Sequence, residues 1–587
     1  MSRNLRLCST QSHRSERPSN DAPSSWLCCW RFHAATASPL LEELSTVKIS
    51  HARTDILSPA RGVTLRNRRT RVIWSTVDLP LIERMQQSAT AFFPATASSN
   101  VEAVAMCGAA PPVRELPLPG PGEQYRFHFD MTKCIGCKCC VVACNEQNGN
   151  PADILWRRVG EIEGGIYPST QRHYLSVGCN HCLEPTCMTG CPVDAYSKDG
   201  ITGIVRHSAD LCIGCQYCTW NCSYGVPQYN AERGVVGKCD MCYGRLTRGQ
   251  SPACVSACPE DAIQIELVNI AEWRTHYEPL ANSPGMPSAD DSLSTTRITL
   301  PSSGGSGLRR VDITHLQTEQ PHWPLIIMTV LTQLSAGLFA VSTWMQFEHR
   351  GAISFAAELG LAIAIAALFA STFHLGRPIH AARALKMWRR SWLSREVLLF
   401  SLFAASATIC SASMLFGNSA TGVLGIFTSL LGIAGVAASA RLYLAPGRPA
   451  WDTRITFMEF FATTFLLGVA AMTGLSKEDL HLHALLFCAA IFCALSMSLK
   501  IVRLRFASRH ELFASWQLLS TVLVNKLLLR GAFLLLGTWL FANSQDIALK
   551  SLAFAALAAG EFMGRYLFFV SVVPSNIASG YLAAEAA

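Results

Sequence analysis

Sixteen cysteines between residues 134 and 258 fall into four groups of four, and their spacing is the feature of the sequence that points most directly to chemistry. Groups one and three repeat the pattern C-x2-C-x2-C-x3-C, which wraps a short loop around a four-iron cluster. Three thiolates of such a loop bind one cluster, and the fourth, at the start of the next helix, binds a neighbouring cluster. Four groups therefore predict four [4Fe–4S] clusters. The predicted ligands are Cys134, Cys137, Cys140, Cys144; Cys179, Cys182, Cys187, Cys191; Cys212, Cys215, Cys218, Cys222; and Cys239, Cys242, Cys254, Cys258.

Structural zinc is the main alternative, because paired C-x2-C motifs also form four-cysteine zinc sites. Zinc pairs require neither a third cysteine two residues further on nor a proline directly after the fourth, and here Pro192 and Pro259 follow groups two and four. Disulfides are less favoured still, because cysteines this close in sequence do not form a sensible set of bridges. The x2 spacing also selects Cys140 as the ligand, which leaves Cys139 as a spare thiol.

The composition indicates a membrane protein. Charged residues make up 15% of the 587 residues, against about 25% in an ordinary globular protein. Hydrophobic residues reach 50%, and nearly all of the excess follows residue 322. The net charge of +8 is spread over termini and loops. It indicates membrane topology and a basic leader, and no nucleic-acid partner is expected.

Residues 1–120 are rich in Ser, Arg, Ala and Pro and show no sustained hydrophobic period. The basic clusters are not followed by an apolar run, so the segment is not a secretory signal, and the Arg68-Arg69 pair makes no convincing twin-arginine signal. We expect either a disordered extension or a start codon assigned too early, with Met106 and Met131 as later candidates.

Residues 121–270 are expected to form an α+β ferredoxin-like domain of the double bacterial ferredoxin type. Alternating strands are predicted at 125–130, 156–159, 174–177 and 262–266, with Gly164-Gly165 at a turn. Residues 271–321 are rich in Ser, Gly, Pro and Asp, and predict a flexible linker.

Residues 322–580 predict an all-α transmembrane domain. Apolar stretches of about 20 residues recur, each long enough to cross a hydrocarbon core of about 30 Å. A buried core in a soluble helical protein is the alternative, but charges are almost confined to the segments between the stretches. The eight expected helices are 324–346, 353–373, 397–416, 421–440, 455–475, 481–499, 523–543 and 551–572.

The loops between these helices predict an orientation. Loops 2–3, 4–5 and 6–7 together carry thirteen Lys and Arg, whereas the opposite loops carry three, Arg350, Lys477 and Lys550. Basic loops face the cytoplasm. Two helices separate loop 2–3 from the cysteine-rich domain, so that domain is expected on the cytoplasmic face.

A few ionisable residues fall at or within the apolar stretches. His374, at the end of the second helix, could exchange a proton with a quinone, but a histidine that caps a helix C-terminus is an equally good interpretation. Glu358 lies in the second helix. Glu561 and Arg565, four residues apart in the last helix, suit a mutual ion pair, which favours a structural role for them.

Two parts of the sequence resemble known subunits. The stretch 125–270 resembles the four-cluster electron-transfer subunit of DMSO-reductase-type molybdenum enzymes, on segments such as Asp210–Cys218, Pro227–Glu232 and Lys238–Cys242. The stretch 322–580 is similar to the DmsC-type membrane anchor, on His322–Leu325, His374–Gly376 and the Gly-Glu and Gly-Arg pairs of the last helix. The two subunits are usually separate chains, so the sequence resembles a fusion of both.

The resemblance implies a pairing of the cysteines. The first three of group one share a cluster with Cys258, those of group two with Cys222, those of group three with Cys191, and the pair of group four plus Cys254 with Cys144. Because Cys215 is present, group three is expected to hold four irons, not three. Ser223 stands where the family has proline, which removes no ligand.

The resemblance also implies a function. Electrons would pass through four [4Fe–4S] clusters between a separate molybdopterin catalytic subunit and a membrane quinone, ubiquinone or menaquinone. His374, Arg377, Glu561 and Arg565 are the candidate quinone-site residues, and substrate catalysis would belong to the partner. The expected location is the bacterial inner membrane, in contact with lipid.

Two branches of this family remain open. DMSO reductase faces the periplasm, whereas quinone-dependent sulfite dehydrogenase faces the cytoplasm. The charge bias and the run Trp156–Gly165 slightly favour the sulfite branch. A non-catalytic iron–sulfur assembly or redox-sensing protein is the alternative from another class, although a sensor needs only one cluster.

Overall fold

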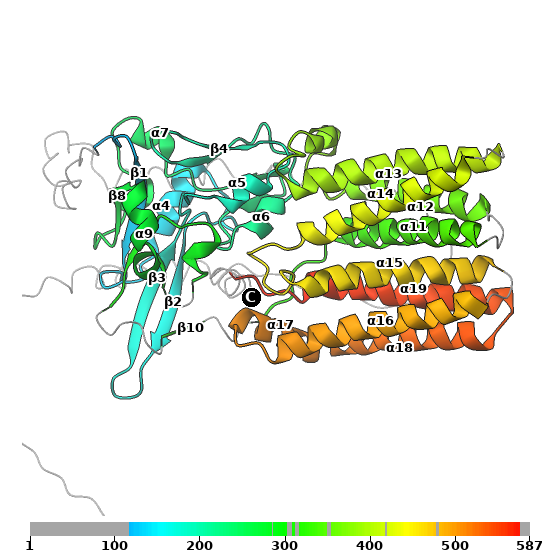
Figure 1. Cartoon of the computed structure of the whole chain (residues 1–587). Helices are drawn as coiled ribbons and strands as arrows, with labels where there is room; N and C mark the ends of the chain where they lie inside the picture. The colour runs from blue at the N-terminus through cyan, green and yellow to red at the C-terminus, as the bar shows by residue number, and fades with distance from the viewer. Residues whose placement is uncertain are drawn as a thin grey trace, which may run out of the picture. The chain divides into compact units, whose positions relative to one another are not determined.

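The computed structural model describes residues 117–283, 286–301, 308–311, 316–348, 354–416, 420–476 and 480–575. Nearly all of the predicted N-terminal extension, residues 1–120, lies outside the described residues, as does the Gly- and Ser-rich stretch 302–307. The described chain contains a domain of small sheets and short helices and a bundle of long helices (Figure 1).

A three-stranded sheet forms the base of the first domain. β1 (Glu123–Asp130) pairs antiparallel with β8 (Ile263–Asn269) in the register Tyr125↔Leu267, and parallel with β9 (Arg297–Thr299). The alternation of β1 places the aromatic rings of Phe127 and Phe129 in the core, each almost fully buried. The first and last predicted strands of the domain are therefore neighbours.

A long hairpin forms a second sheet. β2 (Arg158–Gly164) and β3 (Gln171–Val177) pair antiparallel, and β10 (Arg309–Arg310) adds to β2. The loop between β2 and β3 begins at Gly165, whose φ of +82° suits glycine. Shorter hairpins are β4 (Tyr196–Lys198) with β5 (Val205–His207), and β6 (Gln228–Asn230) with β7 (Val235–Gly237).

Short helices follow the cysteine loops, as the ferredoxin pattern predicts. Each begins within or directly beside a cysteine group, so the end of the loop and the start of the helix are positioned together. These helices are α4 (Cys139–Asn148), α5 (Thr186–Gly190), α6 (Tyr217–Asn221), α7 (Tyr243–Leu246) and α8 (Ala253–Ser256).

The predicted linker 271–321 is folded in much of its described part, which corrects the expectation of a flexible tether. It contains α9 (Ile270–His276), α10 (Glu278–Ala281), the 3-10 helix η2 (Ala289–Asp291) and β9. Trp273 is buried, and its indole N–H donates to the carbonyl of Ser294 at 2.9 Å. Hydroxyl groups of this segment make hydrogen bonds to distant residues, such as that from Thr296 to the Asn180 side chain at 2.8 Å.

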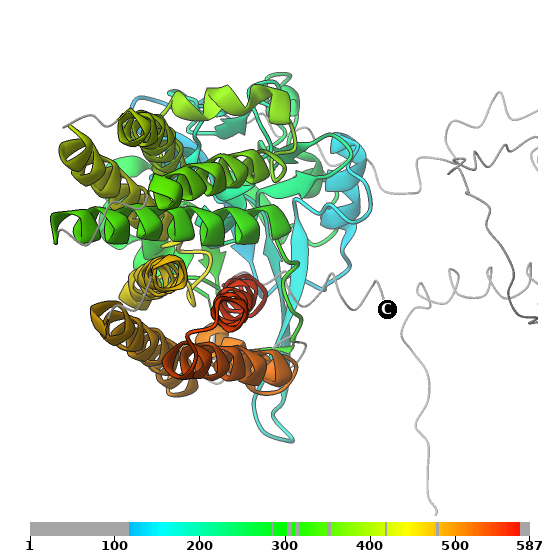
Figure 2. The same cartoon turned by 90° about the vertical axis from the view of Figure 1, so that its right-hand side faces the viewer.

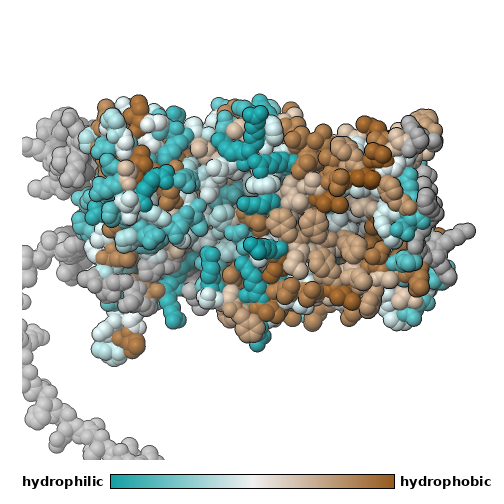
Figure 3. All heavy atoms as spheres, viewed as in Figure 1, coloured by the Kyte–Doolittle hydropathy of each residue, from teal (hydrophilic) through white to brown (hydrophobic). Residues whose placement is uncertain are grey.

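Eight helices in the described residues are long and apolar enough to cross a membrane, as predicted. Figure 3 shows the hydrophobic band on the surface of these helices. Figure 2 shows the helices packed side by side, viewed roughly along their long axes. They are α11 (Trp323–Phe347), α12 (Ser354–Thr372), α13 (Trp392–Leu415), α14 (Thr421–Leu442), α15 (Arg454–Leu475), α16 (Leu480–Arg505), α18 (Val524–Asn543) and α19 (Ile547–Val570).

Close packing in the bundle uses small residues. A Cβ atom added to Gly337 of α11 would stand 2.2 Å from the carbonyl oxygen of Thr464 and 2.9 Å from the Cα of Gly468, both on α15. Helices in lipid associate through such close contacts, because water supplies no hydrophobic drive between them. Two shorter helices were not predicted: the 3-10 helix η4 (Pro378–Leu385) between α12 and α13, and α17 (His510–Ser520).

Candidate metal centres and membrane junction

The structure brings the sixteen predicted thiols together in four sets. Each set takes three members from one part of the chain and its fourth from another, as the resemblance implies. The sets are Cys134, Cys137, Cys140 with Cys258; Cys239, Cys242, Cys254 with Cys144; Cys179, Cys182, Cys187 with Cys222; and Cys212, Cys215, Cys218 with Cys191.

The loops achieve this because several residues adopt left-handed backbone conformations. Gly136 and Lys138 of group one have φ values of +72° and +60°, and Gly214 and Gln216 of group three have +70° and +59°. The repeated glycine lies between the first two cysteines of each loop, and only glycine adopts this conformation without steric cost. The same turn is therefore built twice from the same sequence pattern.

Backbone amides point at the sulfur atoms. The N–H groups of Gly214 and Met241 donate to Cys212 and Cys239 at 3.4 Å. The amide of Ala262 donates to Cys258 at 3.2 Å. Such bonds stabilise thiolate sulfur and tune the reduction potential of a cluster. The donor set suits iron–sulfur ligation.

Structural zinc is the alternative metal for thiols in such sets. Among residues 117–575, within the ranges that the structure describes, no three His, Cys, Asp or Glu side chains are grouped to hold a single metal ion. A zinc ion needs four ligands within about 2.3 Å of one point. A four-iron cluster is larger than one ion, so its thiolates stand further apart.

Two buried cations, which the sequence analysis did not identify, lie among the thiols. Burial alone would lower the pKa of Arg157, but the nearby thiols of Cys254, Cys140, Cys239 and Cys144 raise it overall. The Arg157 guanidinium donates to the Ser176 hydroxyl at 3.1 Å. A positive charge here offsets the negative charge that ligating thiolates carry.

Lys238 is the second cation. Burial alone would lower its pKa, but neighbouring thiols, first that of Cys179, raise it. Its ammonium group lies 3.7 Å from the Cys179 sulfur and donates to the Cys239 carbonyl at 2.7 Å. Its position directly before Cys239 was the available sequence signal, because this places a lysine beside a predicted ligand.

The predicted quinone motif contacts a cysteine loop directly. The amide of Gly376 donates to the Gly214 carbonyl at 3.4 Å, and the amide of Arg377 donates to the Ile213 carbonyl at 3.1 Å. Gly214 lies between Cys212 and Cys215 of group three. The connection between α12 and α13 therefore lies against the set completed by Cys191.

His374 and Arg377 are both at this junction. Burial lowers the pKa of His374 to about 4, so its imidazole is neutral at pH 7. Its Nδ1 lies 2.5 Å from the Ser371 carbonyl oxygen, which makes Nδ1 the protonated donor and leaves Nε2 as an acceptor. The Arg377 guanidinium donates to the Ala209 carbonyl at 2.9 Å.

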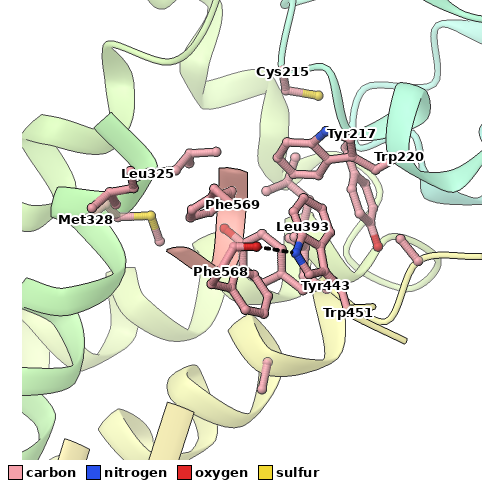
Figure 4. Close-up of a cluster of buried hydrophobic side chains, with 14 of the residues drawn as sticks. Cys215, Tyr217, Trp220, Leu325, Met328, Leu393, Tyr443, Trp451, Phe568 and Phe569 are labelled. Carbon is pink, nitrogen blue, oxygen red and sulfur yellow. Dashed lines mark hydrogen bonds between the residues drawn. The ribbon is translucent and has the colours of Figure 1, made fainter. Parts of the chain in front are cut away.

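An aromatic cluster joins α6 to the membrane helices. Trp220, between Cys218 and Cys222, has its ring centroid 5.4 Å from that of Trp451 and 5.9 Å from that of Tyr443. Trp451 stacks on Phe568 at 5.2 Å, and its indole N–H donates to the Phe568 carbonyl at 2.7 Å (Figure 4). Large rings therefore fill the space between a cysteine loop and the bundle.

Glu561 and Arg565 have other principal partners than the mutual pair expected from their spacing. Arg565 borders the aromatic cluster, because its guanidinium carbon lies 5.4 Å from the Phe568 ring centroid. Glu561 lies 3.6 Å from Arg530 and accepts hydrogen bonds from the Thr463 hydroxyl at 2.5 Å and the Cys493 thiol at 3.2 Å. Arg565 donates to Gln333 of α11 at 2.8 Å.

Nearby, Lys500 pairs with Glu459 at 3.0 Å. Lys500 lies within α16 and not in the loop to which the sequence analysis assigned it, and so do Arg503 and Arg505 in the last turn of that helix. One of the thirteen cations counted on the basic side is therefore a buried partner of an acidic residue.

Two family models match the chain. One, described as a 4Fe-4S dicluster domain, matches residues 170–267, and one described as the DMSO reductase anchor subunit (DmsC) matches residues 316–570. The first falls on three of the cysteine groups and the second on the long helices.

Relatives match the cysteine-rich half. A chain of the anaerobic dimethyl sulfoxide reductase of Haemophilus influenzae is 38% identical over 177 residues, 29% of this chain and 85% of the relative. The probable anaerobic dimethyl sulfoxide reductase chain YnfG of Escherichia coli K12 is 40% identical over 174 residues, 28% and 83% of the two chains. A subunit of the sulfite dehydrogenase of Allochromatium vinosum is 36% identical over 160 residues, which cover 24% of this chain and 67% of the relative.

Proposed function

Because this protein belongs to the family of DMSO reductase iron–sulfur subunits and continues into that enzyme's anchor domain, we propose that it carries electrons between a molybdopterin catalytic subunit and membrane quinone. Four [4Fe–4S] clusters would be held by the four thiol sets. The chain is a multi-pass membrane protein with its electron-transfer and anchor parts in one polypeptide. Substrate chemistry belongs to the partner.

The contact between the His374–Arg377 segment and the Cys212–Cys215 loop carries this proposal. Two of the four candidate quinone residues, His374 and Arg377, are therefore beside one thiol set, so a cluster there would be next to the membrane end of the relay. At another set, Cys137 is exposed, and the exposed side chains of Ile135 and Val142 flank it. That set is the candidate entry point for electrons from a catalytic subunit.

In this proposal, His374 exchanges protons with the quinone. A quinone exchanges two electrons and two protons per turnover, whereas the clusters pass one electron at a time. The neutral His374 ring can accept a proton or a hydrogen bond at Nε2 while Nδ1–H is held by Ser371. Arg377 fixes the backbone of this turn to the cysteine loop. Glu561 and Arg565 are kept as candidates for a more distant part of the quinone site.

The orientation proposed for the chain places the thiol sets on the cytoplasmic face of the bacterial inner membrane. The basic loops lie at the ends of the helices that adjoin the cysteine-rich domain, and basic loops favour the cytoplasm. A cytoplasmic site favours sulfite oxidation over DMSO reduction. The sequence identities to the DMSO reductase chains favour the opposite branch.

Two assays on the complex, purified in mild detergent with its partner, separate these branches. Sulfite-dependent reduction of a quinone analogue would support the cytoplasmic dehydrogenase, and quinol-dependent reduction of DMSO would support the reductase. The absence of both activities, and of a molybdenum subunit in the complex, would favour an assembly or sensing role.

The variant H374Q tests the quinone site. It should lower quinone turnover about 100-fold, the scale of lost general acid–base catalysis, while dithionite still reduces the clusters. The control H380Q removes a histidine six residues further along, in η4. Unchanged turnover in H374Q, or an equal loss in both variants, would contradict the assignment.

A further inference from the structure

The segment that connects α12 to α13 has an unusual charge. Between residues 377 and 395 it carries six cations and no Asp or Glu. We call this range the basic strap; its cations are Arg377, Arg383, Lys386, Arg389, Arg390 and Arg395. Because a membrane-spanning helix enters at one end and another leaves at the other, the strap lies at the level of the lipid headgroups.

One edge of the strap is tied to the cysteine-rich domain. The amide of Met387 donates to the Pro192 carbonyl at 3.2 Å, and the Ser391 hydroxyl donates to the Gly190 carbonyl at 2.6 Å. Arg390 forms an ion pair with Asp194 at 3.1 Å. These contacts fix the strap in place without using all of its charge.

The other edge is free and amphipathic. Lys386 and Arg389 are exposed, and neither has an ion-pair partner within the described parts of the chain. Beside them, the side chains of Ile379 and Trp388 are 95% and 49% exposed. The Arg389 guanidinium lies 5.3 Å from the Trp388 ring centroid. Apolar side chains beside basic ones are the combination that the membrane interface accommodates.

We propose that the free edge of the basic strap binds the phosphate headgroups of anionic phospholipids in the adjoining leaflet. Lys386 and Arg389 contact the phosphate, Trp388 lies at the headgroup level, and Ile379 enters the acyl region. Basic residues attract anionic lipid by about 1 kcal/mol each, and tryptophan prefers the interface. The strap also contacts the loops after Cys191 and before Cys212. Bound lipid therefore stabilises the position of the thiol set formed by Cys212, Cys215, Cys218 and Cys191 against the membrane domain.

The test measures lipid binding and does not depend on quinone chemistry. The purified complex, depleted of lipid in detergent, is titrated with phosphatidylglycerol or phosphatidylcholine and examined by native mass spectrometry. The wild type should retain phosphatidylglycerol preferentially. The variant K386Q/R389Q should bind it about 25-fold more weakly, or about fivefold per cation, the equivalent of that electrostatic energy.

The control R233Q/R248Q removes two exposed cations of the cysteine-rich domain and should leave lipid binding unchanged. Equal retention of both lipids by the wild type, or equal retention of phosphatidylglycerol by K386Q/R389Q and the wild type, would overturn the proposal. Displacement of the lipid by inorganic phosphate at the same concentration would also overturn it, because the site would then recognise phosphate without the lipid.

Discussion

Glu561 pairs with Arg530 of the neighbouring helix, not with Arg565 four residues along its own helix. The Arg530 guanidinium lies 3.6 Å from the Glu561 carboxylate, and both side chains are more than nine-tenths buried. Thr463 and Cys493 donate to the same carboxylate from α15 and α16. One carboxylate therefore joins four helices, α15, α16, α18 and α19, inside the bundle.

Removing one partner of this pair should destabilise the bundle strongly. The variant R530L leaves a buried carboxylate without its cation, which costs about 3–5 kcal/mol. The double variant R530L/E561L removes both charges and should recover most of the loss, because an apolar pair needs no counter-charge. Thermal unfolding in detergent measures both. The control K526L removes an exposed lysine of α18, and a double variant as unstable as R530L would contradict this account.

Gly376 cannot carry a side chain without disturbing the junction. A Cβ atom there would lie 2.2 Å from the Gly234 carbonyl oxygen and 2.7 Å from the Tyr229 hydroxyl. We expect G376A to slow electron transfer from the clusters to a quinone analogue about tenfold or more, because small displacements at a reacting site are costly. Cluster content by electron paramagnetic resonance should be unchanged. In G474A the new Cβ meets nothing within 4 Å, so normal kinetics are expected.

The protein should lose stability in mild acid. Burial lowers the pKa of His374 and of His207 to about 4, below the ordinary value of 6.5. Between about pH 6.5 and pH 4, these histidines take up protons in the unfolded protein but not in the folded protein. The free energy of unfolding therefore falls as the pH drops through this range. Each residue contributes on the order of 3 kcal/mol to that loss.

Melting temperatures between pH 7 and 4.5 measure this effect, with cluster absorbance followed in parallel. The variant H374Q should show a shallower decline than the wild type, because its side chain does not titrate. The variant H276Q removes an exposed imidazole and should follow the wild type. Equal slopes in all three proteins would show that buried histidines do not control acid sensitivity.

Cys139 and Cys140 are adjacent but should differ in iron binding. Cys140 is buried beside the other thiols of its set, whereas Cys139 is exposed. Four clusters correspond to about 16 irons per chain. The variant C140S should lose one cluster and fall to about 12 irons in a colorimetric assay, whereas C139S should keep all of them. Loss of iron in C139S would mean that the loop uses a different ligand.

Local patterns predicted a large part of this structure. The eight membrane helices follow from apolar length alone, because each segment must satisfy its own backbone in lipid. The glycine between the first two cysteines of groups one and three was a further local signal, because it suits the left-handed turn that the structure shows there. The central strand β1 and the edge strand β8 carry their alternation in the sequence.

Long-range partners were not predictable in the same way. The spacing of Glu561 and Arg565 suggested a helical ion pair, yet Arg530 and Gln333 lie closer to their charged groups in the packed bundle. The content of Ser, Gly, Pro and Asp in residues 271–321 suggested flexibility, yet Thr296 in this segment donates a hydrogen bond to the distant Asn180 side chain. Pattern analysis cannot choose partners that are supplied by tertiary packing.

The seam between α6 and the bundle has a kinetic consequence. The amide of Gly447 donates to the Trp220 carbonyl at 3.1 Å, the Ser575 hydroxyl donates to the Ser223 carbonyl at 3.3 Å, and the Trp220 ring is enclosed by aromatic neighbours. A domain held in this way does not have to swing towards the membrane during turnover. Each electron then crosses a constant gap, and its transit time should be indifferent to the viscosity of the surrounding medium.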